Sequence, residues 1–205
     1  MRSLLLVTLA VASLGVAMAQ DRMPEIPADK MTDAQKKAAQ EFAAGRGMPV
    51  FGPFVPLLRS PEVMLRAKAM GDYLRFRNVL PPKLSELTIL ITARHWTQQY
   101  EWDVHYPIAM KAGLAPEIAK AVAEGRRPPQ MPADEELIYD FLTELHGNKS
   151  VSDATYARAV SRLGEQGVID MVAESGYYTM LAMLMNTTRT ALPADHKPAL
   201  PEFPH

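Results

Sequence analysis

Residues 84–114 read LSELTILITARHWTQQYEWDVHYPIAMKAGL, and this stretch decides the fold. From Leu84 to Trp96 the apolar side chains recur three and four positions apart, which predicts a buried helix. A second helix is expected over roughly residues 98–112, because Gly113 then ends the pattern. The stretch therefore predicts two consecutive helices, the first of them buried.

Helical signals continue on both sides of this stretch. Thr32 and Gln35 form a capping box, while Ser60 caps and Pro61 begins another helix. Several prolines and apolar residues between these two helices indicate an irregular but buried segment. No run alternates apolar and polar residues for long enough to predict a strand, so the expected fold class is all-α in one domain. The expected helices cover residues 32–44, 60–78, 84–96, 98–112, 115–124, 133–146, 152–166 and 168–188.

The two ends of the chain are expected to lie outside this domain. Arg2, an apolar run over residues 4–17 and the small residues Ala17 and Ala19 form the pattern of a signal peptide cleaved after Ala19. We therefore expect a periplasmic or secreted protein with no membrane attachment after cleavage. The expected divisions are a signal peptide over 1–19, a flexible lead-in over 20–31, a helical domain over 32–190 and a proline-rich tail over 191–205.

The composition excludes several kinds of chemistry. The chain has 205 residues, with 22 lysines and arginines against 23 aspartates and glutamates, and a formal net charge of -1. Nucleic acids and anionic membranes are bound by an excess of positive charge, so neither is an expected partner. The chain contains no cysteine, which excludes disulfides, thiolate metal sites and thiol nucleophiles. Carboxylates, imidazoles and hydroxyls remain as the groups that can carry chemistry.

Glu101 and His105 form the clearest candidate for a reactive pair. With Gln98 they occupy positions i, i+3 and i+7, so all three project from one helix face and Glu101 can reach His105. A carboxyl group beside an imidazole can exchange protons, and burial moves either pKa towards neutrality. The alternative is a helix-stabilising hydrogen bond on a partly exposed face.

A set of short motifs runs through residues 84–114. They are Leu84-Ser85-Glu86-Leu87, Ala93-Arg94, Tyr100-Glu101-Trp102, His105, Ala109 and Lys111-Ala112-Gly113-Leu114. Together they resemble the carboxymuconolactone decarboxylase family, which shares its helical fold with the AhpD-type alkylhydroperoxidases. The likeness is most specific over residues 84–125 and extends loosely over 54–78 and 152–186. It implies an AhpD-like, all-α fold and assembly of identical subunits into trimers or hexamers.

The peroxidase branch of that superfamily carries Cys-x-x-Cys-x-x-x-His on the corresponding helix. Matching the histidine to His105 puts the two cysteine positions at Gln98 and Glu101, so both thiols are absent. Thiol-dependent peroxide reduction is therefore not expected. The chain instead resembles the Glu-Trp-x-x-His form of the decarboxylase-like branch, which implies proton transfer by Glu101 and His105.

The resemblance implies a lyase or isomerase that acts on a small organic acid or lactone without a cofactor. His105 would donate the proton and Glu101 would orient it, or these roles would be reversed. Arg94 or His95 would bind the carboxylate of the substrate. Alternatively, Arg94 would form a structural ion pair with Glu86 or Glu101, and His95 would cap the helix junction. The competing function is a non-catalytic periplasmic binding or assembly protein on the same fold.

Three further side chains complete the expected site. Gln98, Tyr178 and Asn186 are expected substrate contacts, the last two from the final helix of the same or a neighbouring subunit. The histidines and Glu101 match no metal-ligand motif, so no metal is expected. The final helix is apolar on nearly all sides, which favours burial in the core or against a second subunit, and we expect a homo-oligomer.

Overall fold

The computed structural model describes residues 21–201, and every regular element in that range is a helix. The predicted all-α fold class is therefore confirmed. The predicted signal peptide over residues 1–19 lies outside the described residues, as does the end of the tail over 202–205. The elements are the 3₁₀ helix η1 (Ala28–Lys30) and the α-helices α1 (Asp33–Arg46), α2 (Phe54–Leu57), α3 (Pro61–Phe76), α4 (Pro82–His95), α5 (Gln99–Lys111), α6 (Pro116–Ala123), α7 (Ala133–Asn148) and α8 (Asp153–Thr188).

The ends of the first helices follow local signals in the sequence. The Thr32 hydroxyl accepts a hydrogen bond from the Gln35 backbone at 3.3 Å, and the Gln35 side chain accepts one from the Thr32 backbone at 3.0 Å. The predicted capping box is therefore confirmed. Gly47 ends α1 in the left-handed conformation, with φ of 69°. Ser60 precedes α3 as expected, but its hydroxyl makes no capping hydrogen bond.

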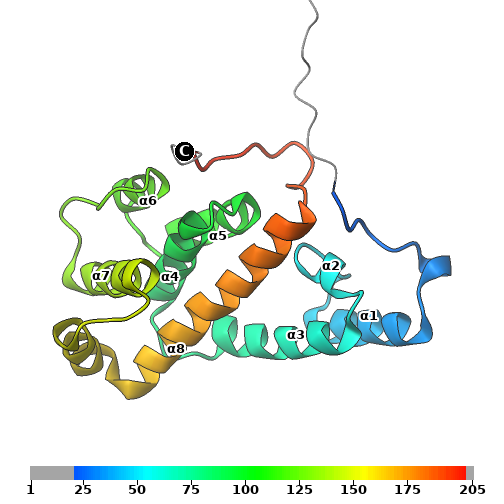
Figure 1. Cartoon of the computed structure of the whole chain (residues 1–205), viewed down its shortest axis with the longest axis horizontal. Helices are drawn as coiled ribbons and strands as arrows, with labels where there is room; N and C mark the ends of the chain where they lie inside the picture. The colour runs from blue at the N-terminus through cyan, green and yellow to red at the C-terminus, as the bar shows by residue number, and fades with distance from the viewer. Residues whose placement is uncertain (1–20, 202–205) are drawn as a thin grey trace, which may run out of the picture.

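Two stretches differ from the expected helices. Within the segment expected to be irregular, the short helix α2 forms, and its Phe54 and Leu57 are buried. The helices expected over residues 152–166 and 168–188 are joined in α8, which turns sharply at Gly164 (Figure 1). Gly164 has φ of 71° and ψ of 168°, a conformation that glycine adopts without steric cost. Across residues 21–201, no helix is both long and apolar enough to span a bilayer.

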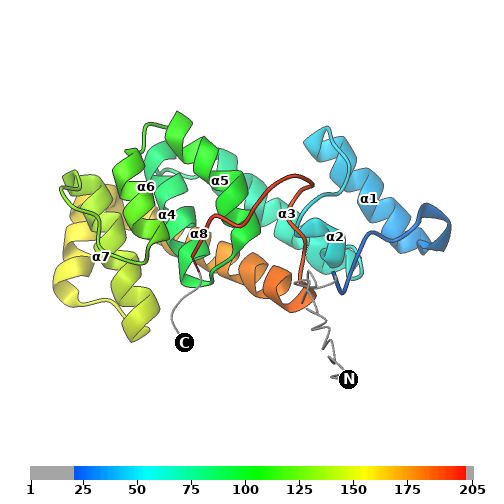
Figure 2. The same ribbon diagram turned by 90° about the horizontal axis from the view of Figure 1, so that it is seen from above.

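Helix α4 lies at the centre of the fold. Every residue from Leu84 to Arg94 is buried, because α5, α7 and α8 pack around this helix. Helix α8 runs diagonally between α1–α3 on one side and α4–α7 on the other (Figures 1 and 2). The apolar core accordingly forms two clusters, one among α4–α7 and one between α1–α3 and the second half of α8. Side chains from both halves meet along α8.

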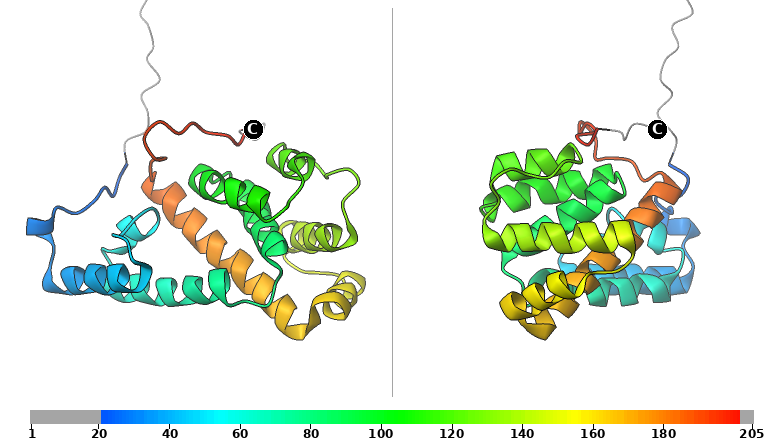
Figure 3. Two further views of the ribbon diagram at one scale, coloured as in Figure 1. Left: turned by 180° about the vertical axis from the view of Figure 1, so that it is seen from behind. Right: turned by 60° about the vertical axis from the view of Figure 1, so that its left-hand side comes forward.

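The C-terminal tail lies against α5 and has no helix up to Pro201 (Figure 3). The side-chain oxygen of Gln99 accepts hydrogen bonds from the backbone N–H groups of Ala199 at 3.0 Å and Leu200 at 2.9 Å. The Gln99 side-chain nitrogen donates to the Leu200 carbonyl at 2.8 Å. The Leu200 side chain is buried in the apolar cluster that α4–α7 form. The tail is therefore held by both backbone hydrogen bonds and apolar burial.

The crossing of α3 and α8 depends on a residue without a side chain. A Cβ atom at Gly71 would lie 2.8 Å from Cζ of Tyr177, whose ring is buried. We expect Gly71→Ala to lower the free energy of unfolding by about 1–3 kcal/mol, because a buried ring cannot move aside without disturbing its neighbours. Urea unfolding followed by circular dichroism measures this difference.

Gly147→Ala in α7 is the matched control, because no atom lies within 4 Å of the added Cβ. This substitution removes a helical glycine, so stability should stay unchanged or rise by up to ~1 kcal/mol. If the two substitutions lower the free energy of unfolding equally, the close approach of α3 and α8 at Gly71 does not limit stability.

Candidate functional site

A cluster of buried and half-buried polar side chains lies where α3, α4, α5 and α8 meet. It consists of Arg75 from α3, Glu86 from α4, Glu101 and His105 from α5, and Tyr178 from α8. His105 is 1% exposed and Glu101 is 3% exposed. A cavity of about 40 Å³ adjoins them, which is room for roughly one water molecule. The cavity is lined by Arg46, Phe51, Pro53, Phe54, Arg75, Tyr100, Glu101, Val104, His105, Tyr177, Tyr178 and Leu181.

The ring of His105 is held at both nitrogen atoms. Nδ1 lies 2.7 Å from Oε2 of Glu86, and Nε2 lies 3.0 Å from Nη1 of Arg75. A guanidinium can only donate hydrogen bonds, so Nε2 must be the acceptor and Nδ1 must carry the proton that it donates to Glu86. Burial lowers the pKa of His105, and the contact with Glu86 opposes this only in part. His105 is therefore a neutral imidazole with its lone pair at Nε2.

Glu101 approaches His105 but does not orient it. Oε2 of Glu101 lies 3.6 Å from Nε2 of His105, which places the two side chains together as the spacing predicts, although the oriented hydrogen bond comes from Glu86. Oε1 is buried and has no hydrogen-bond partner among the described residues. Burial raises the pKa of Glu101 to about 8, with Arg75 lowering it and Glu86 raising it further. The carboxyl group is therefore mainly protonated at neutral pH.

Tyr178 closes the cluster from α8 of the same chain. Its hydroxyl lies 3.4 Å from Nη1 of Arg75, and its ring meets the His105 ring edge to face at 5.0 Å. Burial raises the pKa of Tyr178 well above its ordinary value, so the hydroxyl keeps its proton. The structure therefore places Tyr178 beside His105 and in the lining of the cavity that Glu101 also lines, and its contact with a substrate stays a prediction.

Gln98 and Asn186 form a separate contact at the start of α5. The Gln98 side-chain nitrogen donates to Asn186 at 2.8 Å, and Asn186 donates to the Trp96 carbonyl at 3.0 Å. The Gln98 side-chain oxygen accepts from the Tyr100 backbone at 2.7 Å, which caps α5. Neither Gln98 nor Asn186 lines the cavity beside His105. The structure gives both residues a part in joining α5 to α8.

Arg94 and His95 lie at a different cavity, of about 240 Å³, between α4, α7 and the loop after α6. Arg94 donates to the Pro201 carbonyl in the tail, whereas Glu86 and Glu101 contact His105, at 2.7 Å and 3.6 Å. The His95 ring lies 4.5 Å from the ring of His146. The structure therefore does not bring these two expected substrate contacts to the Glu101–His105 pair.

His146, which the sequence prediction did not include, makes a partly buried contact of its own. Its Nε2 atom lies 2.9 Å from Oγ of Ser175, which lies 3.0 Å from Oγ1 of Thr92. Burial lowers the pKa of His146 to about 4, with His95 and Lys149 lowering it further. Within residues 21–201, no three histidine, aspartate or glutamate side chains come together as a metal site would require.

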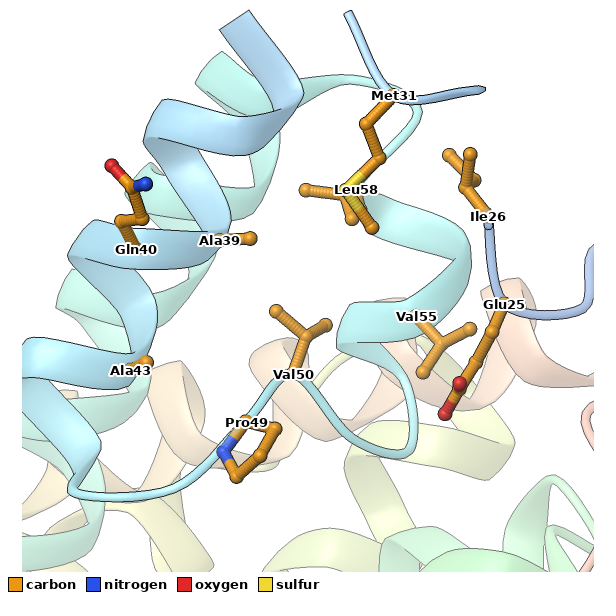
Figure 4. A pocket seen from close by; sticks show the side chains of 10 residues that line it. All are labelled: Glu25, Ile26, Met31, Ala39, Gln40, Ala43, Pro49, Val50, Val55 and Leu58. Carbon is orange, nitrogen blue, oxygen red and sulfur yellow. The ribbon is translucent and has the colours of Figure 1, made fainter. Parts of the chain in front are cut away.

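A larger cavity, of about 370 Å³, lies apart from these side chains (Figure 4). It is enclosed by α1, α2 and the lead-in, and mostly apolar side chains such as Ile26, Val50 and Leu58 point into it. Glu25 is the single titratable residue in its lining. This cavity offers an apolar surface rather than acid–base chemistry.

Sequence reasoning missed Arg75 as a site residue and considered Glu86 only as a partner of Arg94. Glu86 left a signal, because it is a charged residue inside the apolar run from Leu84 to Ile91 and a fully buried charge needs a partner. Arg75 left none, since a charged residue near the end of a helix is usually solvated. A neighbouring carboxyl group, that of Glu174, accepts from Ser85 at 2.5 Å, and burial raises its pKa well above the ordinary value.

The arrangement of the helices matches a solved structure. A crystal structure described as an alkylhydroperoxidase AhpD core, an uncharacterized peroxidase-related protein from Ralstonia eutropha JMP134, superposes with a TM-score of 0.65. The alignment covers 85% of this chain and 93% of that chain at 16% sequence identity. The chain has the AhpD core fold. No protein-family model and no curated protein sequence matches it, so the narrower resemblance to carboxymuconolactone decarboxylases stays a prediction.

The raised pKa of Glu101 predicts how stability depends on pH. In the folded protein this carboxyl group keeps its proton up to a pH of about 8, whereas in the unfolded chain it releases it near 4.5. The contribution of protonated Glu101 to the free energy of unfolding is therefore complete below pH 4.5 and is lost as pH rises through about 8. We expect the free energy of unfolding of the wild-type protein to fall relative to Glu101→Gln over this range. Urea unfolding at a series of pH values measures it.

Glu174→Gln is a second variant for the same measurement. Burial also raises the pKa of Glu174. The difference in the free energy of unfolding between Glu174→Gln and the wild type should therefore change with pH in the same direction. If the free energies of unfolding of the wild type and Glu101→Gln differ by the same amount at every pH, Glu101 is ionised in the folded protein.

Proposed function

We propose that this protein is an exported, cofactor-free lyase of the decarboxylase type, or an isomerase, that acts on a small organic acid or lactone. The observation that carries the proposal is the pairing of a neutral, oriented imidazole with a buried protonated carboxyl group at one cavity. His105 offers a lone pair at Nε2 and Glu101 offers a proton, 3.6 Å apart. Such a pair is suited to moving a proton on a bound substrate.

The electrostatics favour one of the two role assignments that the sequence leaves open. Glu101 holds a proton at neutral pH, so it is the general acid of the proposed reaction, and His105 is the general base. In a decarboxylation, the electron pair of the breaking C–C bond stays on the substrate carbon as carbon dioxide leaves. Glu101 then protonates that carbon. The buried surroundings favour this step, because the substrate loses a charge there.

The absence of cysteine supports proton chemistry over thiol chemistry. The solved structure with the same fold is described as peroxidase-related, and a thiol peroxidase needs a reactive sulfur. This chain has no cysteine among its 205 residues. Glu101, which the family resemblance aligns with a cysteine position of the peroxidase branch, has its carboxyl group beside His105, and burial raises the pKa of this group to about 8.

Turnover of small acids tests the proposal. The purified protein is incubated in D₂O with a panel of oxo acids, unsaturated acids and lactones, and NMR records loss of carbon dioxide or uptake of deuterium. We expect one or more compounds to react. Glu101→Gln and His105→Asn should each reduce the rate by about 10²–10⁴-fold, the usual contribution of a general acid or base.

Glu165→Gln is the matched control, because Glu165 is an exposed carboxyl group on α8 near the turn at Gly164. It should react at the wild-type rate. If the two site variants fold and react as fast as the wild type, the catalytic assignment is wrong. If no compound reacts but one binds at His105, the alternative of a non-catalytic binding protein is supported.

We also propose that the protein assembles with copies of itself, as trimers or hexamers, through α3 and α8. Val63, Met70 and Met180 line a groove between these helices. Further along α8, Ile169 and Met183 lie on the same helix face as Met180 and are largely exposed. An exposed apolar face of this kind is typical of a subunit interface.

Met183→Glu tests this interface. Met183 is 51% exposed in the single chain, so a charge there should be tolerated by the fold but not by an apolar interface. Sedimentation velocity should show a trimer or hexamer for the wild type and smaller species for the variant. Met48→Glu, at a residue 46% exposed in the loop after α1 and outside the helices α3 and α8, should sediment as the wild type does. A monomeric wild type would overturn the proposal.

A further inference from the structure

Two arginines line the cavity beside His105, and they differ in their partners. Arg46 is paired with Asp72 at 2.7 Å. Arg75 donates to Nε2 of His105 at 3.0 Å and to the Tyr178 hydroxyl at 3.4 Å, and no carboxylate among residues 21–201 forms an ion pair with it. A guanidinium binds a carboxylate more strongly than either of these neutral acceptors, through two parallel hydrogen bonds.

Glu101 presents a second group to the same cavity. Its Oε1 atom is buried and has no hydrogen-bond partner in the described part of the chain. A buried polar atom of this kind costs free energy until something pairs with it. Because the carboxyl group is protonated, it can donate a hydrogen bond to an anion that Arg75 holds. The cavity therefore has a cation and a neutral donor on its wall.

The guanidinium of Arg75 lies where it can move. Its Cζ atom is 5.6 Å from the centre of the Phe76 ring, which is 65% exposed, so the group lies at the border between the cavity and solvent. The cavity of about 40 Å³ is too small for an organic acid. A shift of the guanidinium away from Nε2 of His105 would both widen the cavity and uncover the lone pair.

From these contacts we propose that Arg75 binds the carboxylate of the substrate and, by doing so, releases His105 for proton transfer. In the structure, Nη1 of Arg75 donates to the lone pair of Nε2 at 3.0 Å, so with this contact in place the imidazole cannot accept a proton. A carboxylate draws the guanidinium into paired hydrogen bonds, and the lone pair becomes available beside Glu101. This inference rests on the proposed function and narrows the substrate to small molecules that carry a carboxylate.

The proposal replaces the carboxylate contacts that were expected from the sequence. Arg94 and His95 lie at another cavity, whereas Arg75 contacts His105 directly. Arg75 is a binding residue that also positions a proton acceptor, so its removal should change both substrate affinity and the hydrogen bonding of His105. A residue with only a structural role would not show a response to a carboxylate.

Nitrogen NMR of protein with ¹⁵N-labelled histidine tests the proposal, with acetate as the probe and acetamide as its neutral control. The His105 signals are identified by their loss in His105→Asn. In the free wild-type protein, we expect Nδ1 to be protonated and Nε2 to accept a hydrogen bond. Acetate should move the Nε2 resonance towards that of an unbonded imidazole nitrogen, with saturation, and acetamide at the same concentration should not.

Arg75→Met removes the donor and keeps an unbranched apolar stem. Its Nε2 resonance should lie at the unbonded position without acetate, and its acetate affinity should fall by at least about tenfold. Arg77→Met is the matched control, because Arg77 is exposed just beyond α3 and its guanidinium lies over the Tyr73 ring. This variant should respond to acetate as the wild type does.

The outcomes separate this inference from the proposed function. If acetate shifts neither ¹⁵N resonance of His105 in the wild type, the role of Arg75 is overturned. This outcome holds even if Arg75→Met fails to fold. Equal acetate affinity in Arg75→Met and the wild type does the same. A normal acetate response without turnover of any acid supports the role of Arg75 and counts against catalysis. Turnover without an acetate response supports catalysis and overturns the role of Arg75.

Discussion

The hydrogen bond between Nδ1 of His105 and Glu86, at 2.7 Å, is the contact on which the site depends. It joins α5 to the central helix α4 in a region that water barely reaches. Because Nδ1 is committed as a donor, Nε2 is left as an acceptor that faces Arg75 and Glu101. The tautomer and the direction of the imidazole are therefore set by its contacts with α3 and α4, and burial sets its charge.

Burial then determines the charges of the other groups. Burial raises the pKa of both Glu101 and Glu174, because an apolar interior penalises a charged carboxylate, whereas Glu86 lies within hydrogen-bond distance of His105. In the same interior, a polar group of the cluster that lost its hydrogen bond would cost free energy, because water could not replace the partner. A fold in which every residue from Leu84 to Arg94 is buried thus imposes a chemical state on the few polar groups that it encloses.

The sequence predicted the parts of this molecule that depend on local spacing. Helical periodicity and capping residues give the all-α fold, and positions i and i+4 bring Glu101 to His105. Glu86 and Arg75 come from other helices. The spacing of residues along one helix does not predict which other helix packs against it. Arg94 is close to the pair in sequence but faces a different cavity, because the turn between α4 and α5 redirects the chain after His95.

The attachment of the C-terminal tail has a consequence for how this sequence can change. Gln99 contacts only backbone atoms of Ala199 and Leu200, so those hydrogen bonds form whatever side chains stand there, proline excepted. The side chains that matter for this attachment are therefore Gln99, the apolar Leu200, and His196, whose Nδ1 lies 2.7 Å from the carboxylate of Asp103 on α5. At position 199 the side chain can therefore change while the path of the tail over α5 is retained.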